Sequence, residues 1–584
     1  MNLVTSMILR RMRRPFILLI IVYNIAILGM ILIPGVDDQG NTWHMSIFHA
    51  FYFVSYTATT IGFGEIPYAL SEAQRLWAVF SIYILVIAWL YAIGKILTLI
   101  QDPHFKKAVT NTRFRKTVSA INEPFYLVCG LGETGYEVVT ALTEEHYRAV
   151  VIENNPDNLN EIRLHDMREY VPNVIGDASD PVQLEHAGIK HIKCRGVIAL
   201  TSSDDINLKI AITSKLLHPD VKVVCRSELK EYEENMLSFG TDHVVNPFET
   251  FATMFQMLMH SPSLHLIYDW LTGTPKTRLS DPVYFRYGHW ILCGYGRFGK
   301  ELYKLLIEQN IDVTVIDPSL EVRDEFEHHH IDYKKNFIVG TGIDEMTLKQ
   351  AGIETSAGII AGSDNDSNNL SIIMTARAIN PDVFVVARQN LFNNYDLYTA
   401  THANLIMRPR EITARKIRSV FLNPLLVDYL KQADGYDEEW ANVTVSRLSA
   451  VVGNHKPHIW TIEITKTSSP AVAEALEFGR HIRLGHITQD PASRYLKLRC
   501  VPLLHVRGDE KTMMPDDSID IRYGDRILFC GTREIKNSMD WTLKVLSSLN
   551  YVMTFENEPE SYIWRLIHRH LHKTERRKLP RARH

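Results

Sequence analysis

The sequence is poor in cysteine and has almost no net charge. Six cysteines occur in 584 residues, and no two of them form a Cys-x-x-Cys pair. This argues against a disulfide framework or a zinc site, and Cys129 and Cys293 fall in predicted strands as reduced core thiols. The chain has 63 Lys+Arg against 67 Asp+Glu, a balance that gives no indication of a nucleic-acid partner, so none is expected.

Long apolar runs are also few. Phe16–Ile33 contains 18 residues without formal charge, and a second uncharged run begins at Leu76 and extends past Lys95 to Ile100. Each is long enough to cross a bilayer as a helix. A signal peptide is the alternative for the first run, but its apolar region would be shorter, and no small-x-small cleavage motif precedes Pro34. We therefore expect two membrane spans, at about 16–33 and 76–100.

Positive charges gather before the first span and at or after the end of the second, rather than in the segment that connects the spans. The cations near the spans are Arg10, Arg11, Arg13, Arg14, Lys95, Lys106, Lys107, Arg113, Arg115 and Lys116. By the positive-inside rule, both termini face the cytoplasm and residues 35–75 face outside. An Arg-rich helix of the voltage-sensor type is not present in the sequence.

The segment between the spans holds a short apolar stretch followed by a glycine-containing hexapeptide. Ile47–Thr59 is too short to cross a bilayer and leads directly into Thr60-Ile61-Gly62-Phe63-Gly64-Glu65. Non-helical backbone at membrane depth is tolerated only where protein encloses a polar path. Gly62 and Gly64 can adopt backbone angles that let consecutive carbonyls point one way and replace the hydration shell of an ion. An ordinary glycine turn is the alternative.

The hexapeptide resembles the potassium-channel signature, usually written T-V-G-Y-G-D. It differs at Ile61, Phe63 and Glu65, which replace Val, Tyr and Asp. The resemblance implies a filter selective for K⁺ with outer support from a carboxylate; its residues are Thr60, Ile61, Gly62, Phe63 and Gly64, supported by Thr59 and Glu65. Gly94 is the only glycine of the second span and is the candidate gate, with helix packing as its alternative role.

One unit of the remaining chain occurs twice. Phe125–Gly135 matches Trp290–Gly299, and the spacing between these copies also separates Gly176 from Gly340. The repeated units therefore lie near 122–248 and 286–410.

Each copy has the pattern of a nucleotide-binding Rossmann fold. An apolar strand is followed by G-x-G-x-x-G, a helix, and a second strand that ends in Glu153 or Asp317. The glycines let a pyrophosphate approach the helix N-terminus, and an acid at that position favours NAD or an adenine nucleotide over NADP. The predicted nucleotide-binding residues are Gly130, Gly132, Gly135, Glu153 and Asp177 in the first copy, and Gly294, Gly296, Arg297, Gly299, Asp317 and Arg388 in the second.

The two copies differ beside their glycines. Arg297 in the second suits a phosphate, whereas Glu133 in the first would repel one unless it points away. In contrast, the first has Asp177 after its third strand, where the second has Thr341. We expect two Rossmann-shaped clefts, with the second favoured for a nucleotide; the alternative is an empty cleft whose motif serves packing. Arg226 and Arg388 end similar strands and suit phosphate or interface contacts.

The tandem units resemble RCK (regulator of potassium conductance) domains, also called TrkA-N domains. Together with the pore sequence, the resemblance covers most of residues 10–540. It implies an α-helical two-span pore domain followed by α/β Rossmann-like tandem RCK domains and a small α+β C-terminal subdomain. In this family four chains form a homotetramer in the prokaryotic cell (inner) membrane, and eight RCK units form a cytoplasmic gating ring. NAD, ADP or another adenine nucleotide is the expected ligand, with Ca²⁺ as a further candidate.

These observations divide the chain into seven parts. They are an N-terminus 1–14, a pore domain 15–102, a linker 103–121, a first RCK unit 122–285, a second 286–435, a C-terminal subdomain 436–540 and a segment 541–584 with a basic tail. No set of carboxylates stands out as a Ca²⁺ site. His328-His329-His330 is interpreted as a helix end rather than a metal site.

Two other functions account for part of the sequence. A membrane-anchored NAD-dependent oxidoreductase would explain the nucleotide motifs but not Thr60–Glu65, and no acid/base pair of a substrate domain stands out. A regulatory subunit of a potassium transporter would ordinarily lack a pore of its own. The sequence therefore favours a non-enzymatic, ligand-gated potassium channel subunit.

Overall fold

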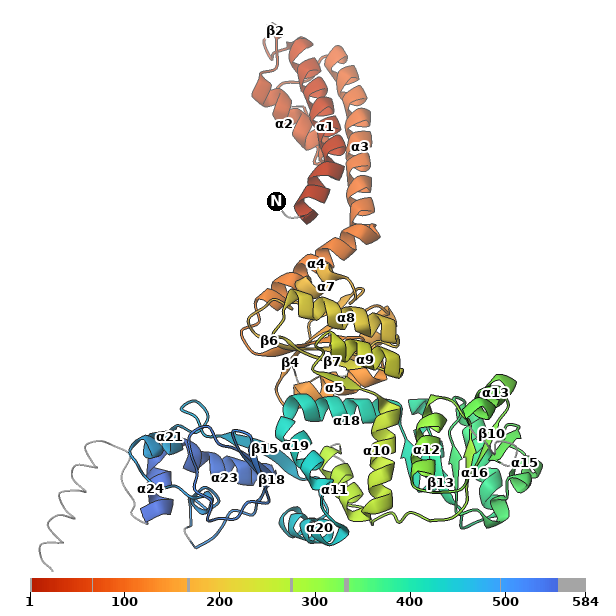
Figure 1. Ribbon diagram of the computed structural model, residues 1–584. Helices are drawn as coiled ribbons and strands as arrows, with labels where there is room; N and C mark the ends of the chain where they lie inside the picture. Colours follow the sequence, from red (N-terminus) through yellow and green to blue (C-terminus); the bar gives the residue numbers. More distant parts are fainter. Residues whose placement is uncertain are drawn as a thin grey trace, which may run out of the picture.

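The computed structural model describes residues 3–65, 67–164, 167, 169–273, 277–329, 336–493 and 495–554. Two long helices stand at one end, the first Rossmann unit lies beneath them, and the second unit and the C-terminal subdomain extend to either side (Figure 1). The predicted fold class is confirmed: apolar helices precede two parallel sheets and one antiparallel sheet. The basic tail and His330 lie outside the described residues.

The membrane part consists of two long helices and one short one. Helices α1 (Leu3–Leu32) and α3 (Glu72–Gln101) contact each other along their length, and α2 (Ile47–Ala58) lies between them in sequence, after a small hairpin of β1 (Gly35–Val36) and β2 (Thr42–Trp43). Only 22% and 28% of their most apolar windows are buried within the chain. Because core helices of a soluble protein would be mostly buried, these faces require lipid or other chains.

Most of residues 103–121, the predicted linker, form a helix. Helix α4 (Pro103–Ser119) begins directly after α3, and Phe114 and Val118 are buried in the core of the first Rossmann unit. The Asp102 carboxylate accepts hydrogen bonds from the backbone N–H of His104 (2.8 Å) and Phe105, and it pairs with Arg11 of α1. The Arg11 hydrogen bond lowers the pKa of Asp102. Because the segment is mostly polar, its sequence did not indicate that Phe114 and Val118 would be buried in the first unit.

The two Rossmann units share one topology, which confirms the repeat. In the first, parallel strands lie in the order β5-β4-β3-β6-β7-β8, and in the second in the order β11-β10-β9-β12-β13-β14. Both faces of each sheet are covered, which explains the continuous apolar strands. Cys129 and Cys293 end the central strands as buried free thiols, as predicted. The strands are β3 (Phe125–Cys129), β4 (Arg148–Glu153), β5 (Asn173–Ile175), β6 (Cys194–Ala199), β7 (Lys222–Arg226), β8 (His243–Val245), β9 (Trp290–Cys293), β10 (Val313–Asp317), β11 (Phe337–Val339), β12 (Gly358–Ala361), β13 (Phe384–Arg388) and β14 (Leu405–Met407).

Short helices connect these strands on both faces. In the first unit they are α5 (Glu133–Glu144), α6 (Pro156–Leu164), α7 (Pro181–His186), α8 (Asp204–Leu217) and α9 (Lys230–Ser238). In the second unit they are α12 (Arg297–Glu308), α13 (Leu320–His329), α15 (Glu345–Gln350), η1 (Ile353–Thr355), α16 (Asp366–Ile379), η2 (Phe392–Asn394) and α17 (Tyr395–Ala400).

The helices that follow each unit pack on the other unit. After the first come α10 (Pro247–His260) and α11 (Pro262–Thr272), and after the second come α18 (Pro409–Leu422) and α19 (Pro424–Ala433). Phe255 of α10 meets Trp290 of the second sheet, with ring centroids 5.8 Å apart. Phe421 of α18 meets Tyr126 of the first sheet at 4.9 Å. The two units therefore exchange one helix each.

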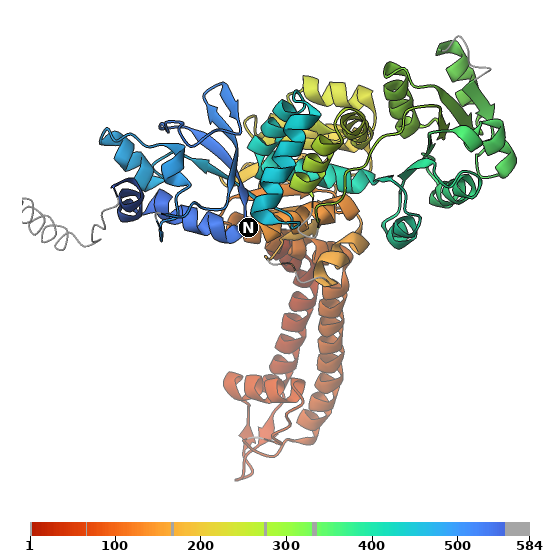
Figure 2. The ribbon, with the colours of Figure 1, turned by 90° about the horizontal axis from the view of Figure 1, so that it is seen from below.

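The C-terminal subdomain is built on an antiparallel sheet. Its order is β15-β18-β16-β17, formed by β15 (His458–Glu463), β16 (Val501–Arg507), β17 (Glu510–Met513) and β18 (Arg526–Gly531). Its helices are α20 (Glu438–Val452), α21 (Pro470–Glu477), α22 (Leu484–Ile487), α23 (Arg533–Lys544) and α24 (Leu546–Thr554). Glu438 of α20 accepts hydrogen bonds from the hydroxyls of Ser261 and Ser263, both at 2.6 Å. Seen from below, this subdomain and the second unit lie on opposite sides of α10, α11, α18 and α19, here called the crossover helices (Figure 2).

We expect Phe421→Ala to loosen the first unit from α18. The ring is 9% exposed, a Cβ at Gly196 would lie 2.6 Å from it, and the Lys222 ammonium lies 5.2 Å from its centroid. Truncation of such a buried ring costs about 3–5 kcal/mol. The urea midpoint of the purified full chain should fall, while Phe239→Ala, at a ring that is 52% exposed, should leave it almost unchanged. Equal midpoints for the two variants would contradict the packing described.

Candidate pore segment and nucleotide-binding clefts

The backbone after α2 alternates between two conformations. Thr60, Gly62 and Gly64 have φ values of 62°, 68° and 90°, whereas Ile61 and Phe63 between them do not enter the positive-φ region. Gly62 and Gly64 thus adopt the left-handed backbone angles that only glycine takes without strain, as expected from the sequence. Thr60 is the one residue of the three with a Cβ, and a left-handed conformation there costs of order 1 kcal/mol.

The short helix α2 holds this segment from behind. The N–H of Ile61 donates to the carbonyl of Tyr56 (2.9 Å), and the Tyr56 hydroxyl donates to the carbonyl of Gly64 (2.5 Å). The Phe63 ring stacks on Tyr52 and meets the Tyr56 ring edge-on, with centroids 6.1 and 5.6 Å away. Neither tyrosine was predicted to support Phe63, although their spacing of four residues places both on one helix face.

The supporting residues contact both ends of the segment. The Glu65 carboxylate accepts bidentate hydrogen bonds from the Arg75 guanidinium (2.9 and 3.0 Å) and a third from the N–H of Leu70 (2.9 Å). Thr59 donates to the carbonyl of Ser55 (2.8 Å). Glu65 therefore joins the outer end of the segment to the start of α3.

Gly94 lies within α3, well away from this segment. A Cβ built there would meet no atom of the chain within 4 Å, so packing inside one chain does not explain the glycine. The Thr98 hydroxyl donates to its carbonyl at 2.7 Å. Its role as a gate stays a prediction.

The first Rossmann cleft is a cavity of about 700 Å³. The structure brings four predicted residues to its wall, namely Gly130, Gly132, Glu153 and Asp177. Gly135 lies behind them, where a Cβ would come within 2.2 Å of the Gly130 carbonyl oxygen. The Glu153 carboxylate accepts hydrogen bonds from the N–H groups of Leu131 and Asn155, which fix it at the end of its strand. Arg226 and Arg410 also line the cavity and supply positive charge.

The second cleft repeats this loop geometry. A Cβ at Gly299 would lie 2.0 Å from the Gly294 carbonyl oxygen, and Gly296 begins the helix as its N-cap. The Asp317 carboxylate accepts hydrogen bonds from the N–H groups of Tyr295 (2.8 Å) and Ser319 (2.9 Å). All four predicted backbone and acid positions thus match those of the first copy.

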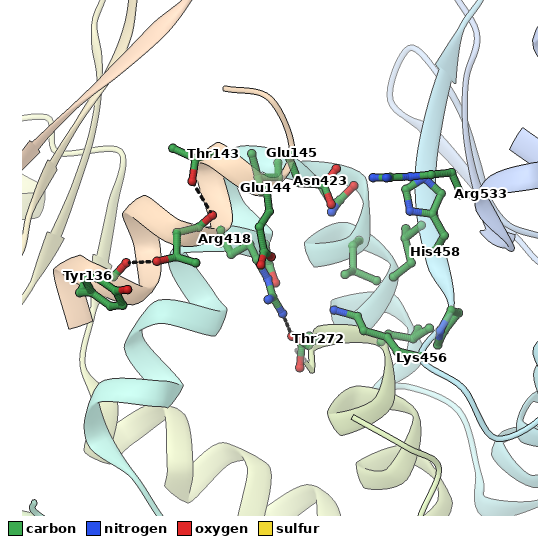
Figure 3. A pocket seen from close by; sticks show the side chains of 18 of the residues that line it. Tyr136, Thr143, Glu144, Glu145, Thr272, Arg418, Asn423, Lys456, His458 and Arg533 are labelled. Atoms are coloured by element: carbon green, nitrogen blue, oxygen red, sulfur yellow. Dashed lines mark hydrogen bonds between the residues drawn. The ribbon is translucent and has the colours of Figure 1, made fainter. Parts of the chain in front are cut away.

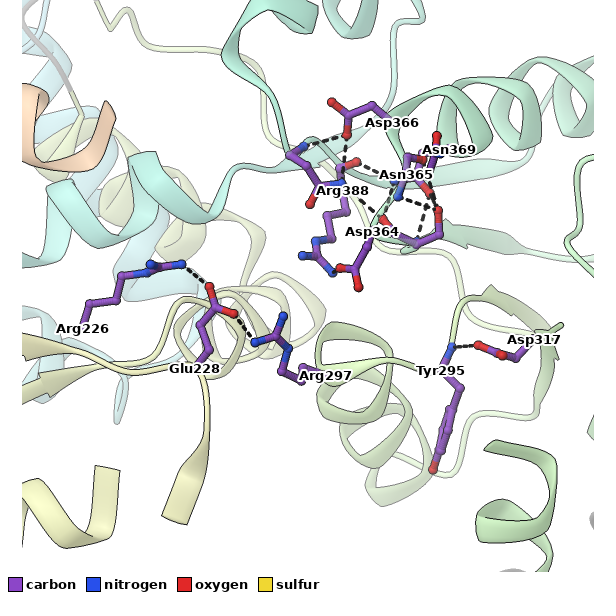
Figure 4. Close-up of polar contacts among 12 residues, drawn as sticks. Arg226, Glu228, Tyr295, Arg297, Asp317, Asp364, Asn365, Asp366, Asn369 and Arg388 are labelled. Atoms are coloured by element: carbon purple, nitrogen blue, oxygen red, sulfur yellow. Dashed lines mark hydrogen bonds and ion pairs between the residues drawn. The ribbon is translucent and has the colours of Figure 1, made fainter. Parts of the chain in front are cut away.

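The two arginines predicted for the second cleft are engaged by protein groups (Figure 4). Arg388 is buried and pairs with Asp364, while Arg297 pairs with Glu228 of the first unit. Both guanidinium groups lie against the ring of Phe248, at 5.0 and 5.7 Å. Burial lowers the pKa of Arg388, although Asp364 opposes that shift. Phe248 and Glu228 could not be connected with this cleft from the sequence, because both belong to the other unit.

Ion pairs cross between the units at both cleft mouths. Glu228 accepts from Arg226 of its own unit as well as from Arg297 of the second. Glu133, which was expected to repel a phosphate unless it pointed away, pairs with Arg410 at the start of α18. Arg297 had favoured the second cleft for a nucleotide, but in the structure it shares the Glu228 carboxylate with Arg226.

The ranges that the structure describes hold no metal-binding cluster. Within those ranges, no three or more His, Cys, Asp or Glu side chains are grouped closely enough to hold a metal ion. His328 and His329 are the last residues of α13, in agreement with their interpretation as a helix end.

Known protein families match most of this architecture. The ion channel family matches residues 16–102, and the TrkA-N domain matches residues 126–247 and 290–409. These matches cover more than half of the chain, which therefore belongs to the two-span channels that carry tandem TrkA-N (RCK) domains. It is a membrane protein of the potassium-channel family expected from the sequence.

Individual proteins are also similar to this chain. The chain is 31% identical to probable potassium channel protein 2 of Methanocaldococcus jannaschii, over 26% of this chain and 45% of that protein. It is 26% identical to potassium channel protein 1 of the same organism, over 34% and 59%. A structure of the GsuK channel aligns over 92% of this chain and 99% of that chain, with 16% identity and a TM-score of 0.47. The chain spans about a third to three fifths of the curated relatives it matches.

We expect Gly135→Ala and Gly132→Ala to differ in stability. The methyl group at residue 135 would overlap the Gly130 carbonyl oxygen at 2.2 Å, whereas at Gly132 it would meet no atom within 4 Å. Overpacking of this kind costs about 1–3 kcal/mol. Thermal unfolding of the full chain without nucleotide should show a lower midpoint for Gly135→Ala and an unchanged one for Gly132→Ala. A matching loss in both variants would contradict this assignment of the two glycines.

Proposed function

We propose that four copies of this chain form a potassium-selective pore in a prokaryotic inner membrane, with both termini in the cytoplasm. The alternation of φ through Thr60–Gly64 supports this most strongly, because it occurs in the hexapeptide between the two membrane helices, where a filter would need unusual backbone angles. Ile61 and Phe63 are 60% and 58% exposed in the single chain, as expected for side chains that neighbouring subunits would cover. The pore would then be enclosed by four such segments.

The differences from the usual signature fit this role. Phe63 lacks the hydroxyl of tyrosine, but Tyr56 supplies a hydroxyl to the Gly64 carbonyl. Glu65 is longer than aspartate and reaches both Arg75 and the backbone of Leu70. These contacts fix the segment to its own helix, and a rigid segment favours one ion size and ligand geometry over another.

We also propose that an adenine nucleotide, NAD or ADP, binds the first cleft and regulates the pore. The cleft has the volume for such a ligand, glycines that admit the pyrophosphate, an acid for the ribose and two arginines at its mouth. Since Arg226 and Arg410 are paired with Glu228 and Glu133, the phosphates would have to compete with these carboxylates. For Ca²⁺, the described residues offer no ligand cluster to build on.

The path from cleft to pore follows α4. A nucleotide can change the equilibrium between the open and closed channel only if it binds one arrangement of the gating ring more tightly than the other. Such a rearrangement would move α4, because Phe114 and Val118 are buried in the first unit, and α4 continues directly into α3. An oxidoreductase, in contrast, would turn over NAD, which gives a direct test between the two functions.

Bilayer recording of the purified chain in potassium and sodium gradients tests the pore. The current should reverse near the potassium equilibrium potential, and Gly62→Ala should abolish it or its selectivity. Gly40→Ala is the matched control, because Gly40 and Gly62 both have positive φ (79° and 68°) and open space around them, but Gly40 lies in the outer hairpin. A reversal potential that ignores potassium, or an unaffected Gly62→Ala current, would refute the proposed pore.

Glu228→Gln should strengthen nucleotide binding in the first cleft. It removes the negative charge that neutralises Arg226 and would compete with a phosphate. Removal of a competitor of about 1 kcal/mol corresponds to roughly three- to tenfold tighter binding in calorimetric titrations with NAD or ADP. Glu234→Gln, at an exposed residue of α9, serves as the control and should change nothing. Unchanged or weaker binding to Glu228→Gln would contradict this competition.

A further inference from the structure

A second cavity lies where three parts of the chain meet. Its volume is about 500 Å³, within the range of small-ligand sites. The end of α5, the end of α11, the α18–α19 corner and the start of the C-terminal sheet all contribute to its wall (Figure 3). It is separate from the Rossmann cleft, since the two share no lining residue.

The charges of this junction pocket are predominantly positive. Arg418, Lys456 and Arg533 line it together with His458, and Glu144 and Glu145 are its two carboxylates. Arg418 donates to the carbonyls of Thr272 and Gly273, and Lys456 donates to the same Gly273 carbonyl. The two cations therefore converge on one helix end.

Lys456 shows the cost of bringing these cations together. Burial, followed by the charges of Arg418 and Arg415, lowers the pKa of Lys456 to about 7, and Glu144 and Glu145 only partly oppose the shift. A nearby anion would favour the ammonium form and reduce the repulsion between the cations. The site is thus electrostatically suited to a negatively charged group.

The rest of the wall determines what that group is attached to. Leu422, Leu426 and Ile459 line the pocket beside the cations, and Asn423 adds an amide. An inorganic anion would leave these apolar side chains without a partner, whereas an anion with an apolar body would contact both kinds of surface.

We propose that the junction pocket binds a small organic anion, in which a phosphate or carboxylate is joined to an apolar ring or chain. The anionic group is held by Lys456 and Arg418, with Arg533 at the edge, and the apolar body lies along α19 and β15. A ligand here contacts the first Rossmann unit, the crossover helices and the C-terminal subdomain at once. Binding would therefore fix their relative positions, an effect on the pore that rests on the proposed channel function.

Calorimetric titration of the full chain in detergent, saturated with NAD, tests the binding itself. The probes are phenyl phosphate and inorganic phosphate. Phenyl phosphate should bind once per chain and more tightly than inorganic phosphate. Lys456→Gln should weaken it at least tenfold, and Asn423→Trp should block it by filling the cavity without a change of charge. Lys466→Gln, at an exposed lysine paired with Glu477, should bind like the wild type.

Other outcomes would overturn the site. Absence of binding to the wild type, or wild-type affinity in both Lys456→Gln and Asn423→Trp, would refute it. Equal affinity for the two probes would refute the role of the apolar wall. Because no current is measured, these results are independent of the channel: a chain that binds phenyl phosphate but conducts no potassium would refute the proposed pore and leave the pocket standing.

Discussion

The exchange of helices between the two Rossmann units determines how the parts of the chain beyond the membrane helices are joined. Helix α10 covers the second sheet and α18 covers the first, so neither unit completes its core with its own chain segment alone. The ion pairs at the cleft mouths follow from this, because Glu228 reaches Arg297, and Arg410 reaches Glu133, only when the units interlock. The junction pocket also depends on it, since α18 brings Arg418 next to α5.

The membrane part is organised by a different requirement. Its helices leave most of their apolar surface uncovered within one chain, while the polar backbone of Thr60–Gly64 is tied to α2 by Tyr56. Water-free surroundings tolerate such backbone only when other protein encloses it. The single chain is thus an incomplete structure at this end, with its internal contacts formed and its outer contacts left for lipid and neighbouring subunits.

The sequence predicted features that depend on local pattern. Apolar length gave the spans, and the repeated glycines and acids gave two Rossmann units with the same strand order. It did not predict contacts between distant segments. Phe248 and Glu228 reach the second cleft from another unit, so the assignment of Arg297 to a phosphate could not account for them. The packing of α4 on the first unit was not predicted, because two apolar residues in a basic helix are a weak signal.

The two ends of α4 are held by different kinds of contact: Asp102 lies at its start, and Phe114 and Val118 lie nearer its end. At the membrane side its carboxylate holds Arg11 through an ion pair, with the arginine side chain 48% exposed, whereas at the other side Phe114 and Val118 are held by burial. Ionic strength weakens the first contact and has little effect on the second. A rise in salt would therefore weaken the Arg11–Asp102 contact between α1 and the start of α4, while α1 stays packed along α3 and α4 stays attached to the first unit.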